Sequence, residues 1–292
     1  QQIGISVGNM ILTGIAAGLI VQGILPFIER VFNVSTAMTL KELNDASHPL
    51  LRQLAERAPG TYQHSLRIAD MSEAAAEAIG CDGLLCRVGA MYHDIGKVNK
   101  PQYFVENQQG GPNRHKKLSP AMSHLIIIGH VKDGVEMARE YGLPPSIRQF
   151  IETHHGTTLV AYFYHAAKER SEEEDKPGPS EYEFRYPGPK PQNRESAILM
   201  LCDAIEGAVR SIEEPTAARI EQMVRQISQN RLTDGQLDEC PITLRDVHKI
   251  EQSLVKTLCA IYHSRIKYPG QDSDEDAEDT APPADARPAA GA

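Results

Sequence analysis

The chain has 292 residues, enough for one large domain or two modest ones, and 41% of them are hydrophobic, which supplies a sizeable core. Its formal net charge of −9 argues against a general nucleic-acid coat, and the absence of Trp argues against an aromatic platform for long single strands. We therefore expect no polymeric nucleic acid as a partner. A small nucleotide stays compatible with this charge, because bound cations can reverse the local field.

An uncharged segment lies near the N-terminus. Residues Met10 to Ile28 contain Gln22 as their one strongly polar side chain, and the segment is about long enough to cross a bilayer as a helix. A signal peptide fits less well, since no basic region precedes the segment and no small-residue cleavage site follows it. A buried core helix is the third interpretation. Because the chain begins with Gln1, we expect residues 1–30 to be the last transmembrane helix of a larger membrane region.

The remaining sequence predicts an all-α fold, because helical periodicity recurs and no sustained strand alternation appears. A connecting helix is expected within residues 31–58, over Ala37 to Arg57, ended by Pro59-Gly60. Further helices are expected over Thr61–Ile79, Leu84–Tyr92, Ala121–Tyr141, Pro145–His154, Arg194–Ser211 and Thr216–Asn230. The glycines expected to stop helices are Gly80, Gly142 and Gly156.

Two polar inserts and a tail interrupt this pattern. Residues 107–118 are rich in Gly, Asn and Lys, and residues 169–192 begin as an acidic run and end too rich in proline for a helix. Residues 270–292 are acidic with Pro and Ala, which predicts a disordered tail. The five cysteines are scattered and form no C-x-x-C pair, which is typical of reduced thiols in a cytosolic domain.

Histidine and aspartate side chains are the candidate metal ligands. His93 and Asp94 supply an imidazole nitrogen and a carboxylate that can bridge two cations, although a lone His-Asp pair recurs by chance. Asp203 lies in an apolar helical stretch, where a buried carboxylate requires a metal ion or a basic partner. The other candidates, each of which alone is more often a surface or core histidine, are His64, His130, His154 and His155. Together they form a mixed nitrogen and oxygen set that suits Fe, Mn, Zn or Ni.

The order of these residues resembles the HD superfamily of metal-dependent phosphohydrolases. Segments such as APGTYQHSL, YHDIGK, IIIGHVKDGVEMA, FIETHHGTTLVAYFYHAA and FRYPGPKPQ resemble one branch, the membrane-anchored seven-transmembrane HD proteins that degrade cyclic di-AMP. The resemblance covers about Thr39 to Pro269 and implies an HD-domain helical bundle over residues 59–269. It also implies a multi-pass protein of the bacterial cell membrane whose HD domain faces the cytoplasm.

The resemblance further implies two divalent metal ions, Fe or Mn. One takes His64, His93, Asp94 and Asp203, and the other shares Asp94 and takes His130, His154 and His155. Asp94 and Lys97 are the expected catalytic residues, and a hydroxide activated by the two metals opens cyclic di-AMP to linear 5′-pApA. Two alternatives stay open: an HD phosphohydrolase acting on cyclic di-GMP or a mononucleotide, and a nucleotide-binding membrane receptor with little turnover.

Substrate contacts are expected at four positions. Lys97 is placed to bind a phosphate oxygen, with a surface lysine as the equal alternative. His115 lies in the polar insert, where a solvated basic loop is the favoured interpretation. Tyr103 and the segment around Arg185 are candidates for stacking on adenine. The oligomeric state stays open, a homodimer included.

Overall fold

The computed structural model describes residues 2–32, 34–108, 111 and 113–263 of the chain, and within them it is all-α, as the sequence predicts. The α-helices are α1 (Gln2–Phe32), α2 (Ala37–Leu43), α3 (Pro49–Arg57), α4 (Pro59–Ala78), α5 (Gly83–Tyr92), α6 (Pro120–Glu140), α7 (Pro145–Thr153), α8 (Ala161–Glu173), α9 (Arg194–Arg210), α10 (Ala217–Thr233) and α11 (Leu244–His263). Short 3₁₀ turns are η1 (Ile95–Asn99), η2 (Pro101–Tyr103), η3 (Val105–Asn107), η4 (Arg114–Lys117) and η5 (Glu181–Phe184). The predicted tail, residues 270–292, lies outside the described residues.

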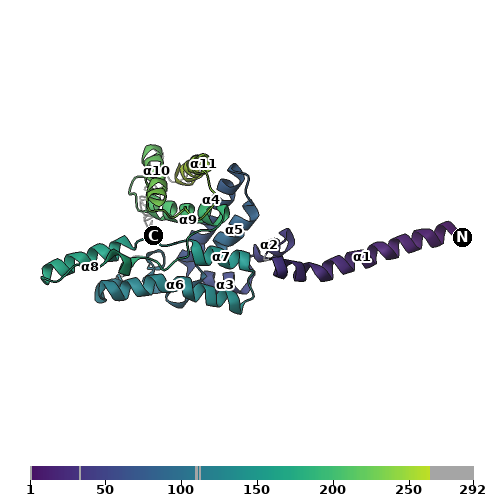
Figure 1. Cartoon of the computed structure of the whole chain (residues 1–292), viewed down its shortest axis with the longest axis horizontal. Helices are drawn as coiled ribbons and strands as arrows, with labels where there is room; N and C mark the ends of the chain where they lie inside the picture. The colour runs from purple at the N-terminus through teal and green to yellow at the C-terminus, as the bar shows by residue number, and fades with distance from the viewer. Residues whose placement is uncertain (1, 33, 109–110, 112, 264–292) are drawn as a thin grey trace, which may run out of the picture.

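Helix α1 projects away from the bundle formed by the other helices (Figure 1). Its segment Ser6–Glu29 has a mean hydropathy of 2.1, is long enough to cross a membrane, and has no share of its apolar window buried. Because the bundle covers none of this window, the buried core helix is the wrong interpretation of this segment.

The core is formed mainly by α4, α5 and α9, with α10 and α11 packed on one side and α6 and α7 on the other (Figure 1). Alanines of α4 such as Ala75 and Ala76 are fully buried, which lets α5 approach closely. Helices α5, α6 and α9 begin at polar side-chain caps: Asp82 accepts from the amide of Leu85, Ser119 from Met122, and Asn193 from Ser196. Capping and small-residue packing therefore fix where these helices start and how near they lie.

The connecting helix expected over residues 37–57 is divided into α2 and α3. Asp45 accepts a hydrogen bond from the amide of Ser47, and His48 caps the helix that Pro49 begins. Such side-chain turns compete with continuous helix, and proline fits best at a first helical position. For the same reason Pro59 begins α4 instead of only ending the helix before it.

Two helices were missed by the sequence interpretation. Helix α8 extends into the insert expected from residue 169, so that its acidic run is helical up to Glu173. Helix α11 buries Ile250, Leu254 and Leu258, which recur every fourth residue. The glycines behave as predicted: Gly80, Gly142 and Gly156, which follow α4, α6 and α7, have φ of 71°, 69° and 52°.

Candidate metal centre

All seven predicted ligands lie together where five helices meet. His64 comes from α4, His93 ends α5 and is followed by Asp94, and His130 comes from α6. The remaining candidates are His154 and His155, at the end of α7, and Asp203 of α9. His155 and Asp203 are partly exposed, whereas the other five side chains are buried. The fold thus brings together residues that are spread over almost half of the chain.

Asp94 lies at the centre of this cluster, and its two oxygens face different histidines. Oδ2 lies 3.2 Å from Nε2 of His93 and 3.8 Å from Nε2 of His64. Oδ1 lies 3.3 Å from Nε2 of His130 and 3.7 Å from Nε2 of His154. The carboxylate therefore has one oxygen for each half of the set, which is the arrangement a bridging ligand requires.

Asp203 lies across the cluster from Asp94. Its Oδ1 is 3.0 Å from Nε2 of His64 and 3.8 Å from Nε2 of His93, and its Oδ2 is 3.8 Å from Nδ1 of His155. The histidines hold the pKa of this carboxyl well below its usual range, against the effect of burial. Asp203 is therefore an ionised acceptor directed at the same space as Asp94.

The outer ring nitrogens of the histidines are held by acceptors. Nδ1 of His93, His130 and His154 lies 2.7, 2.6 and 2.9 Å from the carbonyl oxygen three residues earlier in the chain. A carbonyl only accepts, so each Nδ1 donates, and this leaves the lone pair of each neutral ring on Nε2. His64 differs, because its Nδ1 lies 2.8 Å from Oε2 of the buried Glu206. Such outer partners orient metal-binding imidazoles.

The inner atoms of the cluster fit a divalent cation. Among the described residues, Nε2 of His93 and Oδ1 of Asp94 are buried without a hydrogen-bond partner, whereas Oδ2 of Asp94 has the ammonium of Lys97 at 2.6 Å. Nε2 of His130 lies 3.2 Å from Nε2 of His154, which brings two lone pairs face to face. Buried acceptors are costly unless a positive group joins them. Groups of ligand atoms within 4.8 Å of one another include His64, His93 and Asp94, and also His130, His154 and His155.

The protonation of the histidines divides the cluster. Burial lowers the pKa of His154 to about 3 and that of His155 well below its usual value, so both rings stay neutral and can bind metal at physiological pH. Burial also acts on His93, but Asp94 and Asp203 outweigh it and raise the pKa of His93 to about 10. In the protein without metal, His93 therefore carries a proton that a bound cation would release.

Lys97 is fixed inside the site. Its Nζ lies 2.6 Å from Oδ2 of Asp94 and 2.9 Å from Oε1 of Glu106, and it sits 5.0 Å from the centre of the Phe104 ring. The side chain is only 13% exposed, so the surface lysine is the wrong interpretation. The two carboxylates outweigh burial and raise the pKa of the ammonium, which keeps it charged.

Gly96 permits the close approach of α6 to the His-Asp segment. A Cβ at this position would lie 1.9 Å from the carbonyl oxygen of His130 and 2.5 Å from the amide nitrogen of Gly134. Both neighbours are backbone atoms, so only a shift of α6 could make room. The glycine therefore determines how near His130 comes to Asp94.

We expect Gly96→Ala to destabilise the fold by about 1–3 kcal/mol, the usual cost of overpacking. The same displacement of His130 should weaken metal binding. Gly129→Ala is the matched control, because a Cβ there meets nothing within 4 Å and alanine favours the helix. Urea unfolding and metal titration of the two variants check this. Equal metal affinity in Gly96→Ala and the wild type would contradict the role given to Gly96.

Within the described residues, the side chains of Tyr103, His115 and Arg185 make no hydrogen bond, ion pair or ring contact with the seven ligands. Nε2 of His115 lies 2.8 Å from the carbonyl oxygen of Tyr103, and the two rings are 5.4 Å apart. Arg185 pairs with Glu181 and with Asp234, at 2.8 Å for the latter. The rings that contact the cluster belong to the residues that follow Tyr103 and Arg185. The ring centre of Phe104 lies 5.7 Å from that of His130, and Tyr186 stacks on His155 with ring centres 4.2 Å apart.

Glu206, Glu106 and Arg231 complete the surroundings of the cluster and were missed by the sequence interpretation. Glu206 is buried, and it also lies 3.2 Å from Nε of Arg67. Its spacing of three from Asp203 places both carboxylates on one face of α9, which is a signal that could have found it. Glu106 and Arg231 have no such signal.

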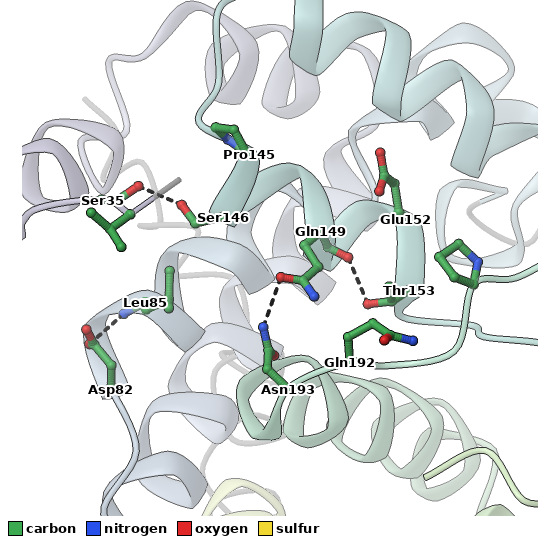
Figure 2. A pocket seen from close by; sticks show the side chains of 12 residues that line it. Ser35, Asp82, Leu85, Pro145, Ser146, Gln149, Glu152, Thr153, Gln192 and Asn193 are labelled. Atoms are coloured by element: carbon green, nitrogen blue, oxygen red, sulfur yellow. Dashed lines mark hydrogen bonds between the residues drawn. The ribbon is translucent and has the colours of Figure 1, made fainter. Parts of the chain in front are cut away.

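A cavity of about 590 Å³ lies on another side of α7, and none of the candidate ligands lines it. Figure 2 shows Ser35, which follows α1, and Ser146 of α7 with their hydroxyl oxygens 2.6 Å apart. In the same view Asn193 donates to Oε1 of Gln149 at 2.9 Å. Helix α7 is thus fixed at one end by the segment after α1 and carries His154 and His155 at the other.

Comparisons with known proteins identify the proteins to which this chain is similar. The family model described as HD domain matches residues 61–208. The chain is 46% identical to cyclic-di-AMP phosphodiesterase PgpH of Bacillus subtilis and 45% identical to the protein of that name from Listeria monocytogenes, over 91% and 90% of its length. It spans only 37% and 36% of these relatives. The crystal structure of the L. monocytogenes PgpH HD domain in complex with cyclic di-AMP matches 75% of the chain and all of the solved chain, with 46% identity and a TM-score of 0.71.

Proposed function

This chain belongs to the HD domain family, and we propose that it is a metal-dependent phosphodiesterase that hydrolyses cyclic di-AMP to linear 5′-pApA. The observation that carries the proposal is the buried carboxylate of Asp94, whose two oxygens face two separate groups of histidine Nε2 atoms. Such a bridge suits a pair of cations, and a pair of cations suits in-line displacement at phosphorus. The relatives named for this activity support the choice of substrate.

We propose that the seven candidates hold the metals in two sets. His64, His93, Asp94 and Asp203 form one set, and His130, His154 and His155 form the other with Asp94 shared. Two divalent ions held in this way supply activation of water and neutralisation of the charge that develops on the phosphoryl group. The mixed imidazole and carboxylate donors suit Fe, Mn, Zn or Ni, and among these the family resemblance favours Fe or Mn. Metal analysis of protein purified without oxygen tests this assignment, and a preparation that binds no transition metal would contradict it.

The chain's own residues have further roles in the proposed reaction. Asp94 stays ionised because His93 and Lys97 outweigh the effect of burial and hold its pKa well below the usual range. The ammonium of Lys97, already 2.6 Å from Asp94, is placed to face a phosphate oxygen as well. Attack of water on phosphorus then breaks the bond to the 3′ oxygen and leaves a 5′ phosphate. Contacts with the substrate at Tyr103, His115 and Arg185 stay predictions.

The direct test is an assay with the full chain in detergent, loaded with Mn²⁺ or with Fe²⁺ under anaerobic conditions. We expect cyclic di-AMP to be consumed faster than cyclic di-GMP or a mononucleotide, with 5′-pApA as the product. Faster turnover of another nucleotide would contradict cyclic di-AMP as the substrate and assign that nucleotide instead. Tight binding of cyclic di-AMP by metal-loaded protein without any product would instead support a receptor.

We further propose that α1 crosses the bacterial cell membrane and that the HD domain, residues 59–269, faces the cytoplasm. The apolar surface of Ser6–Glu29, which the bundle leaves uncovered, supports this. The full chain should stay with membranes through alkaline extraction. Replacing both Ile15 and Leu19 with arginine should release it, because each arginine costs about 2.5–3.5 kcal/mol on insertion. Release of the wild type by alkali would contradict a spanning helix.

A further inference from the structure

Arg231, in the last turn of α10, is a cation without a partner in the described part of the chain. No carboxylate of the described residues lies within 4.0 Å of its guanidinium, and its Nε is buried without a hydrogen bond. Burial lowers the pKa of this guanidinium, but an arginine keeps its charge at physiological pH. A half-buried guanidinium whose Nε is buried without an acceptor is costly to retain, and its natural partner is an anion brought from outside.

The carboxylate of Asp234, which is close to Arg231 in sequence, is already paired with other side chains. Asp234 lies three residues after Arg231. Its oxygens accept hydrogen bonds from Arg185, at 2.8 and 3.1 Å, and from the side-chain amide of Gln236 at 2.8 Å. Asp234 acts on Arg231 only through its field. The carboxylate that could have paired with Arg231 instead holds the loop after α10.

This loop brings the end of α10 to the metal centre. The amide of Gln236 donates to the carbonyl oxygen of Arg231 at 3.0 Å, and the Gln236 side chain accepts from the amide of Thr157 at 2.9 Å. Thr157 is two residues after His155. Arg231 is also within electrostatic reach of Asp203 and of Tyr186, whose ring stacks on His155. Through Gln236, the end of α10 is therefore tied to the segment that follows His155, and the charge of Arg231 acts on the groups of the metal centre.

We propose that Arg231 binds a non-bridging phosphate oxygen of the substrate beside the metal centre. The planar guanidinium suits phosphate better than an ammonium does, because it presents paired donors. Helix α10 lies beyond residues 61–208, so this contact would come from outside the matched HD segment. The inference rests on the proposed function only in taking a phosphodiester as the substrate.

The test compares Arg231→Ala and Arg231→Lys with the control Arg225→Ala. Arg225 lies on the same helix, is exposed, and pairs with Glu221 at 2.7 Å. We expect Arg231→Ala to lower kcat/KM by about 100-fold or more, the usual effect of losing a donor to transition-state charge. Arg231→Lys should recover part of this loss, and Arg225→Ala should match the wild type. Metal content should be equal in all four proteins.

A minimal phosphodiester, bis(p-nitrophenyl) phosphate, separates phosphate binding from adenine binding. If Arg231 contacts phosphate, Arg231→Ala lowers kcat/KM by similar factors for this compound and for cyclic di-AMP. A loss confined to cyclic di-AMP, or a loss explained by missing metal, would overturn the assignment.

Binding of inorganic phosphate to metal-loaded protein, measured by calorimetry, keeps the inference independent of turnover. We expect affinity to fall at least about tenfold in Arg231→Ala, as for the loss of a charge-assisted hydrogen bond. Equal affinity in this variant and the wild type would overturn the role of Arg231 even if the enzyme hydrolyses cyclic di-AMP. A wild type that hydrolyses no phosphodiester but needs Arg231 to bind phosphate would overturn the proposed function instead.

Discussion

Asp94→Ala is expected to abolish binding of both metal ions and to lower the rate of cyclic di-AMP hydrolysis by more than about 100-fold. Loss of a partner that merely orients a ligand already costs about 10–100-fold, and Asp94 faces both groups of histidines directly. Metal content after gel filtration, together with a product assay, checks both effects. Retention of two ions per chain by the variant would exclude Asp94 as the bridge.

Because Asp94 is also the partner of the buried Lys97, its removal carries a structural cost of about 3–5 kcal/mol, the usual cost of breaking a buried ion pair. Asp94→Asn keeps the shape of the side chain and is the second variant if the alanine protein does not fold. Asp70→Ala is the matched control. Asp70 is exposed, its ion pair with Arg87 includes none of the candidate ligands, and an exposed ion pair contributes little to stability. Circular dichroism of all three distinguishes loss of metal from loss of fold.

Metal binding is expected to raise the thermal midpoint of the bundle by about 5–10 °C. An ion present at 100 times its dissociation constant stabilises the folded state by about 2.7 kcal/mol, and each kcal/mol is worth about 2–4 °C in a domain of this size. The ligands come from α4, α6, α7 and α9 as well as from the end of α5, so unfolding any of these helices releases the ions. Differential scanning calorimetry before and after chelation measures the shift.

The size of this stabilisation should increase with pH. Since His93 holds a proton in the metal-free protein, with a pKa raised to about 10, metal binding must release that proton. Apparent metal affinity, and with it the thermal shift, should therefore increase as the pH is raised from 6 toward 9. Asp94→Asn should show no shift at any pH. Equal midpoints for metal-loaded and metal-free wild type would contradict a site assembled from these helices.

The sequence predicts the helices that carry the ligands to within a few residues, because their periodicity and caps are local properties. Beyond the ligand set that the family resemblance implies, it could not predict which side chains meet. His64 and Glu206 are 142 residues apart, and nothing in their spacing indicates a contact. Glu106 reaches Lys97 only because the turns η1 to η3 fold back beside α4, and turns of that kind depend on tertiary packing.

The two missed helices have different causes. The pattern of Ile250, Leu254 and Leu258 in α11 is a clear local signal that the sequence interpretation did not use. The acidic end of α8 was assigned to an insert on composition, although Arg170 and Glu174 are spaced to form the ion pair that the structure contains. The division of the connecting helix depended on capping by His48, a residue that the sequence interpretation assigned no role.

The outer partners of the histidines have a consequence for how the site tolerates mutation. Three imidazoles donate to backbone carbonyl oxygens, which are present whatever side chain stands at Ala90, Ile127 or Ile151. Substitution of the side chains at these positions therefore does not remove the carbonyl acceptors. His64 differs from these three, because its outer nitrogen depends on a side chain, that of Glu206, which a single substitution can change. Variation in metal preference among natural sequences of this type should accordingly be concentrated at the Glu206 position and at the arginines around it.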